Sequence, residues 1–138
     1  MNSDSTALCH LTEYTTLVFD CDGVVLDSNQ IKTEAFRQAA LPWGAAAADA
    51  LADYHVHHGG VSRYVKFRHF LDRIVPDCAT VDEGLGMEAM LETFSESVRD
   101  GLMFCAVAEG LAELREATLG AHWLIVSGGD QAELRQIF

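Results

Sequence analysis

Proline and basic residues are both scarce in this sequence. Two prolines among 138 residues, and no low-complexity tract, argue against a disordered chain, and 49% hydrophobic residues are enough to build a packed core. Only 9 Lys and Arg residues accompany 21 Asp and Glu residues, which gives a net charge of −12. Because that charge repels polyanions, we expect no binding to nucleic acid or to an anionic membrane surface.

Paired cysteines, a leader peptide and long apolar runs are also lacking. The four cysteines lie far apart without a CxxC pair, which predicts free thiols in a reducing cytoplasm. Residues 1–14 have neither the basic start nor the apolar centre of a signal peptide. No apolar run approaches the roughly 18 residues that a membrane span requires. We therefore expect a cytoplasmic protein without a membrane segment.

Strand patterns near both ends of the chain enclose a helical middle. Apolar and β-branched runs predict buried strands over 15–20 and 122–126. Apolar residues at helical spacing predict helices over 28–40, 45–57, 62–74, 80–100 and 108–117, and a last helix after residue 130. The sequence therefore predicts an α/β protein, with a partial core formed by 1–28 and 101–138 and an all-helical insertion over 29–100.

Two acids follow the first predicted strand at positions i and i+2. Asp20 and Asp22 can aim at one site from the carboxyl end of that strand, which is where open α/β sheets place their chemistry. Their oxygens suit magnesium. Asp20 can attack phosphorus, and Asp22 can exchange a proton with the leaving group and with water. An ordinary Asp-Gly turn at Gly23 is the alternative, and the continued match over 24–28 makes it a minor one.

A hydroxyl follows the second predicted strand. Ser127 and Gly128 lie between this strand and the last predicted helix, where a hydroxyl and backbone N–H groups can hold a phosphate. Because Ser-Gly-Gly is also a common turn, this signal is weak when taken alone.

Residues 20–28, with the sequence DCDGVVLDS, resemble the first motif of the haloacid dehalogenase (HAD) superfamily. The match is to the form DxDGVxxDS found in its phosphoglycolate phosphatase and β-phosphoglucomutase-like branch. The resemblance implies a Rossmann-like HAD core with an inserted helical cap, Asp20 as nucleophile and Asp22 as acid/base. It also implies magnesium bound by the Asp20 carboxylate and the Asp22 backbone carbonyl, and phosphate binding by Ser127. Dehalogenases proper lack the second acid, so Asp22 favours phosphoryl transfer.

Residues 60–63 resemble the cap loop of β-phosphoglucomutase-like members, whose arginine grips a distal phosphate or another polar group. This implies substrate binding by Ser62, Arg63 and Lys66, the last two being one helical turn apart. Solvated helix charges are the alternative. Lys32 stands where the mutase pattern has histidine, which weakens a mutase assignment. Three nearby histidines lack metal-ligand spacing and are predicted to form a polar helix end: His55, His57 and His58.

The resemblance implies two further motifs that the sequence does not show. A Lys or Arg that neutralises the phosphoryl charge, and an acidic pair that completes the magnesium site, follow the serine strand by some tens of residues in the family, whereas eleven residues follow Ser127 here. We therefore hypothesise a truncated form of a magnesium-dependent phosphatase that hydrolyses small phosphorylated metabolites through a phosphoaspartyl intermediate. The alternatives are a phosphomutase and a non-catalytic fragment. We expect little or no activity from these 138 residues alone.

Overall fold

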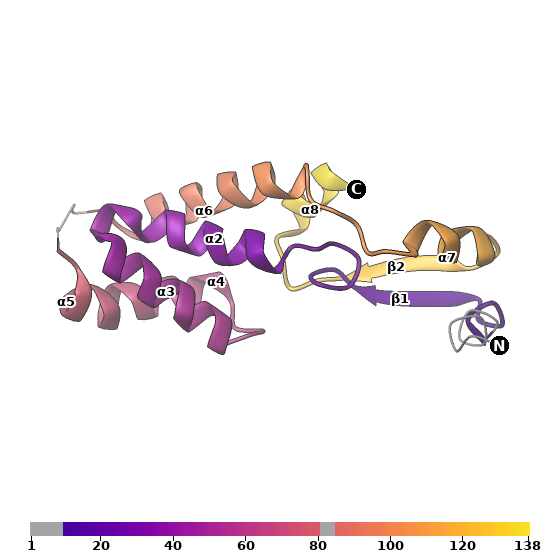
Figure 1. Cartoon of the computed structure of the whole chain (residues 1–138), viewed down its shortest axis with the longest axis horizontal. Coiled ribbons are helices and arrows are strands. Elements are labelled where there is room, and N and C mark those ends of the chain that lie inside the picture. The colour runs from indigo at the N-terminus through magenta and orange to yellow at the C-terminus, as the bar shows by residue number, and fades with distance from the viewer. Residues whose placement is uncertain (1–9, 81–84) are drawn as a thin grey trace. The chain divides into compact units, whose positions relative to one another are not determined.

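The computed structural model describes residues 10–80 and 85–138 and confirms a mixed α/β chain that is mostly helical (Figure 1). Its elements in order are β1 (Thr16–Asp20), α2 (Asn29–Ala40), the 3-10 helix η1 (Leu41–Trp43), α3 (Ala45–His57), α4 (Arg63–His69), the π-helix η2 (Phe70–Ile74), α5 (Val75–Cys78), α6 (Met87–Leu102), α7 (Leu111–Ala117), β2 (His122–Val126) and α8 (Gln131–Ile137). The strand predicted over 122–126 and the helix predicted over 45–57 are confirmed at both ends.

The chain divides into two compact units. The sheet unit contains the described residues up to Asp27 together with Cys105–Ser127, and the helical unit contains Ser28–Phe104 and Gly128–Phe138. The last helix therefore groups with the helical unit, whereas the sequence placed it in the α/β core.

The sheet unit is built on two parallel strands. β1 pairs with β2 in a register that sets Asp20 opposite Val126. On one face of this pair, the Phe19 and Trp123 rings lie 4.7 Å apart, and the Trp123 indole N–H donates to Thr118 Oγ1, just after α7, at 3.0 Å. Asp20 belongs to the other face, because side chains alternate along a strand. Three apolar side chains of that second face are exposed: Val18, Leu124 and Val126. The pair establishes an α/β class, and a Rossmann-like arrangement remains a prediction.

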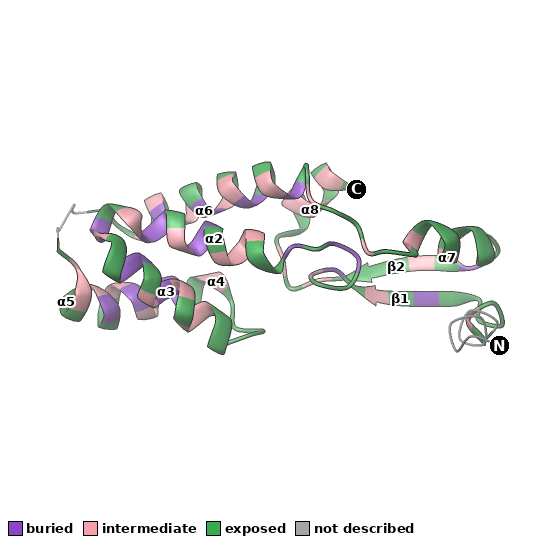
Figure 2. Cartoon of the chain, in the orientation of Figure 1, coloured by how far each residue is buried: buried purple, intermediate pink, exposed green. Residues whose placement is uncertain are grey.

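The helical unit is organised around α2, which packs against both α3 and α6 (Figure 1). Its buried face carries small alanines and Phe36. Figure 2 shows buried, intermediate and exposed positions along α2. The Phe36 ring lies 5.1 Å from Phe67 of α4 and 4.5 Å from Phe94 of α6, so that one aromatic cluster joins three helices. Gly101 lets α6 approach α2 closely, since a side chain there would meet Ile31.

Two local predictions for the helical unit are wrong. The helix predicted over 62–74 continues through η2 and α5 to Cys78. Pro76 lies in the first turn of α5, where a missing N–H is tolerated, and the π-helix η2 relaxes the helical pattern before it. The apolar spacing over 62–74 makes Tyr64 an expected packing residue, but its side chain is 54% exposed. The helix predicted over 80–100 is observed from Met87, and its 81–84 portion lies outside the described residues.

Candidate functional site

The carboxyl edge of the sheet holds the first predicted site residues. Asp20 ends β1, and Ser127 directly follows Val126, the residue paired with Asp20. The parallel pairing therefore brings Asp20 and Ser127 to the same edge of one sheet. Asp20 is exposed and Ser127 is partly buried. Gly128 is exposed, with open space where a side chain would lie.

The acidic loop that follows Asp20 is closed by its own backbone. The carbonyl of buried Cys21 accepts the N–H groups of Val25 and Leu26, both at 3.0 Å. Gly23 adopts a positive φ of 71°, which favours glycine, and its N–H donates to the Leu26 carbonyl at 2.8 Å. Strand alternation directs the Cys21 side chain away from the two acids and predicts a small core residue, and Cys21 is fully buried. The hydrogen bonds fix the backbone between the two acids.

The Asp20 carboxylate is oriented by this loop. Its Oδ1 accepts the backbone N–H of Cys21 at 2.7 Å, a charge-assisted hydrogen bond that restricts rotation of the side chain. Asp22, two residues on, forms a bridge with Leu26 and is only partly buried. The arrangement gives one anchored, exposed carboxylate and a second acid on a short, hydrogen-bonded loop.

A neighbouring segment holds the far side of the same loop. The Asp27 N–H donates to the Ala106 carbonyl, and the Ala108 N–H donates to the Val25 carbonyl, both at 2.9 Å. Burial, followed by the negative charge of Asp27, raises the pKa of the Cys105 thiol, and the charge of Asp22 raises it further. The acids of the loop therefore create a negative field inside the sheet unit.

A cavity of about 340 Å³ lies between the loop and this segment. Its lining includes Gly23, Val24, Asp27 and Val107. Neither Asp20 nor Ser127 lines it, so the cavity adjoins the acidic loop without containing the expected reaction centre.

Magnesium is the ion that the sequence predicts at Asp20 and Asp22. Among residues 10–80 and 85–138, no group of three or more His, Cys, Asp or Glu side chains is positioned to hold a metal. The donors that are present fit magnesium in kind, because this ion accepts one or two protein carboxylates and completes its shell with water and phosphate oxygens. The exposed Asp20 carboxylate and the Asp22 carbonyl are the oxygens that would bind it.

The start of α8 differs from the expected phosphate cradle. The Asp130 carboxylate accepts the backbone N–H groups of Ala132 at 2.9 Å and Glu133 at 3.1 Å. This side chain already caps the helix and adds negative charge there. Phosphate binding at Ser127 and Gly128 would therefore depend on the turn itself.

Arg63, the predicted substrate-binding arginine, is engaged within the helical unit. Its Nη1 and Nη2 donate to the two carboxylate oxygens of Glu133 at 3.1 and 3.3 Å, and Nη1 also donates to Ser95 Oγ at 3.1 Å. Its guanidinium lies 5.2 Å from the centre of the Phe94 ring. Ser62 caps α4, its hydroxyl accepting the Val65 N–H at 3.4 Å. The Glu133 carboxylate therefore already accepts hydrogen bonds from both terminal nitrogens of Arg63.

Lys66, the third predicted cap residue, is only 2% exposed. Its Nζ lies 2.8 Å from Nδ1 of His55 and 5.3 Å from the centre of the Phe36 ring. Burial and the charge of Lys32 lower the Lys66 pKa. Burial, then the charges of Lys66 and Lys32, lower the pKa of His55 from 6.5 to about 4. Lys66 is therefore not a solvated helix charge, which was the alternative considered from sequence.

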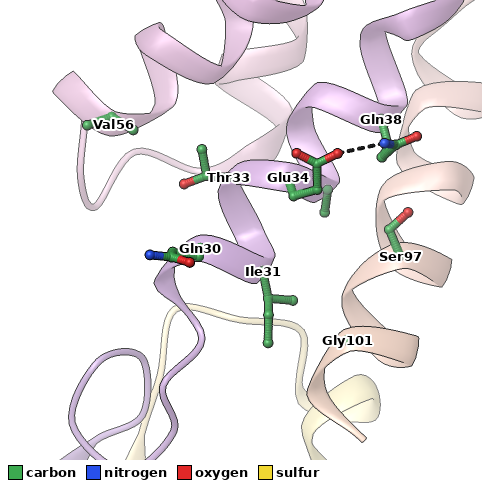
Figure 3. Close-up of a pocket in the computed structure, with 9 residues that line it drawn as sticks. Gln30, Ile31, Thr33, Glu34, Gln38, Val56, Ser97 and Gly101 are labelled. Atoms are coloured by element: carbon green, nitrogen blue, oxygen red, sulfur yellow. Dashed lines mark hydrogen bonds between the residues drawn. The ribbon is translucent and has the colours of Figure 1, made fainter. Parts of the chain in front are cut away.

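The helical unit also contains a cavity of about 630 Å³ (Figure 3). α2 supplies most of its lining, and Gln38 Nε2 donates to Glu34 Oε1 at 2.6 Å beside it (Figure 3). None of the predicted site residues lines this cavity. We assign it no role in the candidate site.

Two partners in these arrangements were not identified from sequence. Glu133 is separated from Arg63 by 70 positions, and His55 is separated from Lys66 by 11. Neither spacing is a recognised motif, and no local pattern announces either pair. For the pair of Lys66 and His55, the sequence offered one signal: Lys32, His55 and Lys66 are basic residues in a short acidic chain.

Comparison with protein-family models, with curated proteins and with solved structures finds no match to this chain. Within the described part of the chain, no helix combines the length and apolar character needed to cross a membrane.

Proposed function

We propose that this chain carries the nucleophile loop of a magnesium-dependent phosphatase that acts on small phosphorylated metabolites. The observation that supports the proposal best is the meeting of Asp20 and Ser127 at the carboxyl edge of one parallel strand pair. A carboxylate beside a hydroxyl suits a reaction in which one group attacks phosphorus and the other hydrogen-bonds to the phosphoryl oxygens.

In the proposed reaction, Asp20 attacks the phosphorus of a phosphomonoester. A bond forms between a carboxylate oxygen and phosphorus, the bond from phosphorus to the leaving oxygen breaks, and Asp22 donates a proton to that oxygen. Asp22 then removes a proton from water, which attacks the phosphoaspartyl group and returns Asp20 and inorganic phosphate. Ser127 and the Gly128 backbone would hold the phosphoryl oxygens.

Magnesium, when bound by Asp20 and the Asp22 carbonyl, would reduce the repulsion between these acids and the phosphate dianion. The hydrogen bond from the Cys21 N–H to Asp20 Oδ1, at 2.7 Å, leaves the second carboxylate oxygen for attack. The closed backbone of the loop supports the proposal, because a nucleophile that is already oriented loses less entropy in the reaction.

The helical unit would supply substrate binding through Arg63 and Lys66, with Ser62 in a supporting role. Arg63 already holds a carboxylate with both arms of its fork. A substrate phosphate or carboxylate has the same two-oxygen geometry, so it could replace Glu133 there. Ser62, as the cap of α4, would position Arg63 rather than contact the substrate.

A non-catalytic binding protein is the second candidate. It is favoured by the Asp130 carboxylate, which already caps the start of α8 and adds negative charge where the phosphate is expected. A phosphomutase is a third outcome of the same chemistry, distinguished by dependence on a bisphosphate and by retention of the phosphoryl group.

Hydrolysis of p-nitrophenyl phosphate with magnesium tests the proposal. We expect slow turnover that is lost in Asp20→Asn and retained in Asp27→Asn, a matched change at an exposed acid of the same loop. A parent chain without any turnover would favour the binding protein. Equal turnover by the parent and Asp20→Asn would refute Asp20 as the nucleophile.

A further inference from the structure

A further cavity, of about 430 Å³, belongs to the helical unit. It lies where α3 packs against α4 and η2. Tyr54 of α3 lines it, together with six residues from α4 and η2: Tyr64, Val65, Arg68, His69, Asp72 and Arg73. None of the predicted site residues is among them. The volume falls within the range of roughly 300–1,000 Å³ that is common for small-molecule sites.

Stacked rings build one wall of this cavity. The Tyr54 ring centre lies 3.9 Å from that of His58 and 4.0 Å from that of His69, with interplanar angles of 24° and 9°. Two nearly parallel rings at these distances cannot share one face of a phenol without overlapping, so each histidine covers a different face. Neither face of Tyr54 is therefore free for a ligand, and the stack makes this wall rigid.

Tyr64 supplies the free aromatic surface of the cavity. Its side chain is 54% exposed, and its ring makes no aromatic contact within the described part of the chain. Val65, equally exposed, adds apolar surface beside it. Exposed aromatic faces of this kind stack on planar rings, as they do on nucleobases. Tyr64 is thus placed to contact the ring of a ligand.

Two arginines give the cavity a positive balance. Arg37 and Arg63 each bind a carboxylate. Arg68 and Arg73, by contrast, have no ion-pair partner among the residues that the structure describes. Asp72 also lines the cavity and offsets only one of these two charges. In a chain with 21 acidic and 9 basic residues, two such guanidinium groups beside one cavity indicate a local preference for an anion.

The π-helix η2 contributes to this arrangement. Its hydrogen bonds run from i to i+5, so Arg73, five residues after Arg68, turns back towards the face of Arg68 further than it would in an α-helix. Short π-helical turns are rare and occur frequently at functional sites. The helix therefore departs from the α form in the segment that supplies Asp72 and Arg73 to the cavity.

We propose that this cavity binds a small molecule in which an aromatic ring carries a phosphate group, the chemistry of a nucleoside monophosphate. The ring stacks on Tyr64, and Arg68 and Arg73 donate hydrogen bonds to the phosphate oxygens. A polynucleotide is disfavoured, because a net charge of −12 repels polyanions. The site shares no residue with the proposed phosphatase reaction or its substrate-binding set, so it does not rest on phosphoryl transfer at Asp20.

Titration calorimetry of the 138-residue chain with AMP, in a buffer without phosphate and magnesium, tests the site. We expect saturable binding with a dissociation constant of about 1 mM or tighter. Adenosine, which lacks the phosphate, and inorganic phosphate, which lacks the ring, should each bind at least roughly tenfold more weakly. In histidine-selective NMR, the His69 signals should shift over the same range of AMP concentration. Asp20→Asn should bind AMP as the parent does.

Changes of charge in the cavity should act with opposite signs. Arg68→Gln and Arg73→Gln should each weaken AMP binding by about three- to tenfold. Asp72→Asn should strengthen it by about two- to threefold, because it removes a charge that repels the phosphate. Arg99→Gln changes an exposed arginine of α6 that does not line the cavity, and it should bind AMP as the parent does.

The aromatic contact has its own matched pair of variants. Tyr64→Ala should weaken AMP binding by about tenfold, whereas Tyr64→Phe, which keeps the ring, should not. Circular dichroism checks that each variant is folded, and all the changed side chains are exposed. Absence of AMP binding, or unchanged binding in both Arg68→Gln and Arg73→Gln, would overturn the proposal. Tighter binding of a short oligoadenylate than of AMP would overturn the assignment to a small molecule.

Discussion

Protonation of His55 should destabilise the fold in mild acid. The native ring is held neutral by burial and by two lysines, which lower its pKa from 6.5 to about 4. The unfolded chain therefore takes up a proton at this position before the native chain does. The stabilising contribution of neutral His55 is complete above pH 6.5 and is lost as the pH falls towards about 4.

The size of this effect follows from the lowering of the His55 pKa. Taken without correction, it corresponds to about 3 kcal/mol in the free energy of unfolding. Because the ring is partly exposed, solvent screening reduces the expected contribution to about 1–2 kcal/mol. His55→Gln removes the titrating group while keeping an oxygen that can accept a hydrogen bond from Lys66.

Urea denaturation of the parent and His55→Gln, in a buffer free of phosphate and carboxylates, measures this contribution. Between about pH 7 and about pH 4.5 the parent should lose roughly 1–2 kcal/mol more unfolding free energy than His55→Gln. His57→Gln, a change at an exposed position of α3, should follow the parent. Parallel pH profiles for the parent and His55→Gln would refute the claim that burial and the neighbouring lysines lower the His55 pKa.

Three further results are expected. Gly101→Ala should lower the unfolding free energy by about 1–3 kcal/mol in urea melts, because the added methyl group pushes α6 away from α2. Gly59→Ala should not destabilise, since an added methyl group there has no neighbouring atom within 4 Å. Equal effects of the two changes would contradict the close packing of α6 on α2. Cys105 should react slowly with iodoacetamide near neutral pH, and Asp27→Asn should accelerate the reaction by removing a charge that raises the thiol pKa; an unchanged rate would oppose that cause. Glu133→Gln should cost about 1 kcal/mol in urea melts at low salt and less at high salt, and a salt-independent loss would argue against the ion pair with α4.

The secondary structure could be predicted largely because it rests on local patterns. The run from Ala45 to His57 has high helix propensity and lies between two glycine-containing breaks, so its bounds were recognisable. The apolar strand His122–Val126 was equally clear. Pro76 misled the prediction, because a proline ends a helix from the interior but is accepted in a first turn.

The candidate site could be predicted only where it depends on strand direction. Asp20 and Ser127 each follow an apolar strand, and parallel pairing brings such ends together. The partners of Arg63 and Lys66 depend instead on how α3, α4, α6 and α8 pack. Helical spacing along one element contains no information about contacts that its side chains make with other elements.

The central claim is that Asp20 is a phosphoryl acceptor, and mass spectrometry after exposure to acetyl phosphate and magnesium tests it most directly. A single transfer is easier to detect than turnover, and its product is an acyl phosphate that hydroxylamine removes. We predict one phosphoryl group on the peptide that contains Asp20, none in Asp20→Asn, and normal labelling in Asp27→Asn. Absence of the adduct in the parent, or its persistence in Asp20→Asn, would contradict the account.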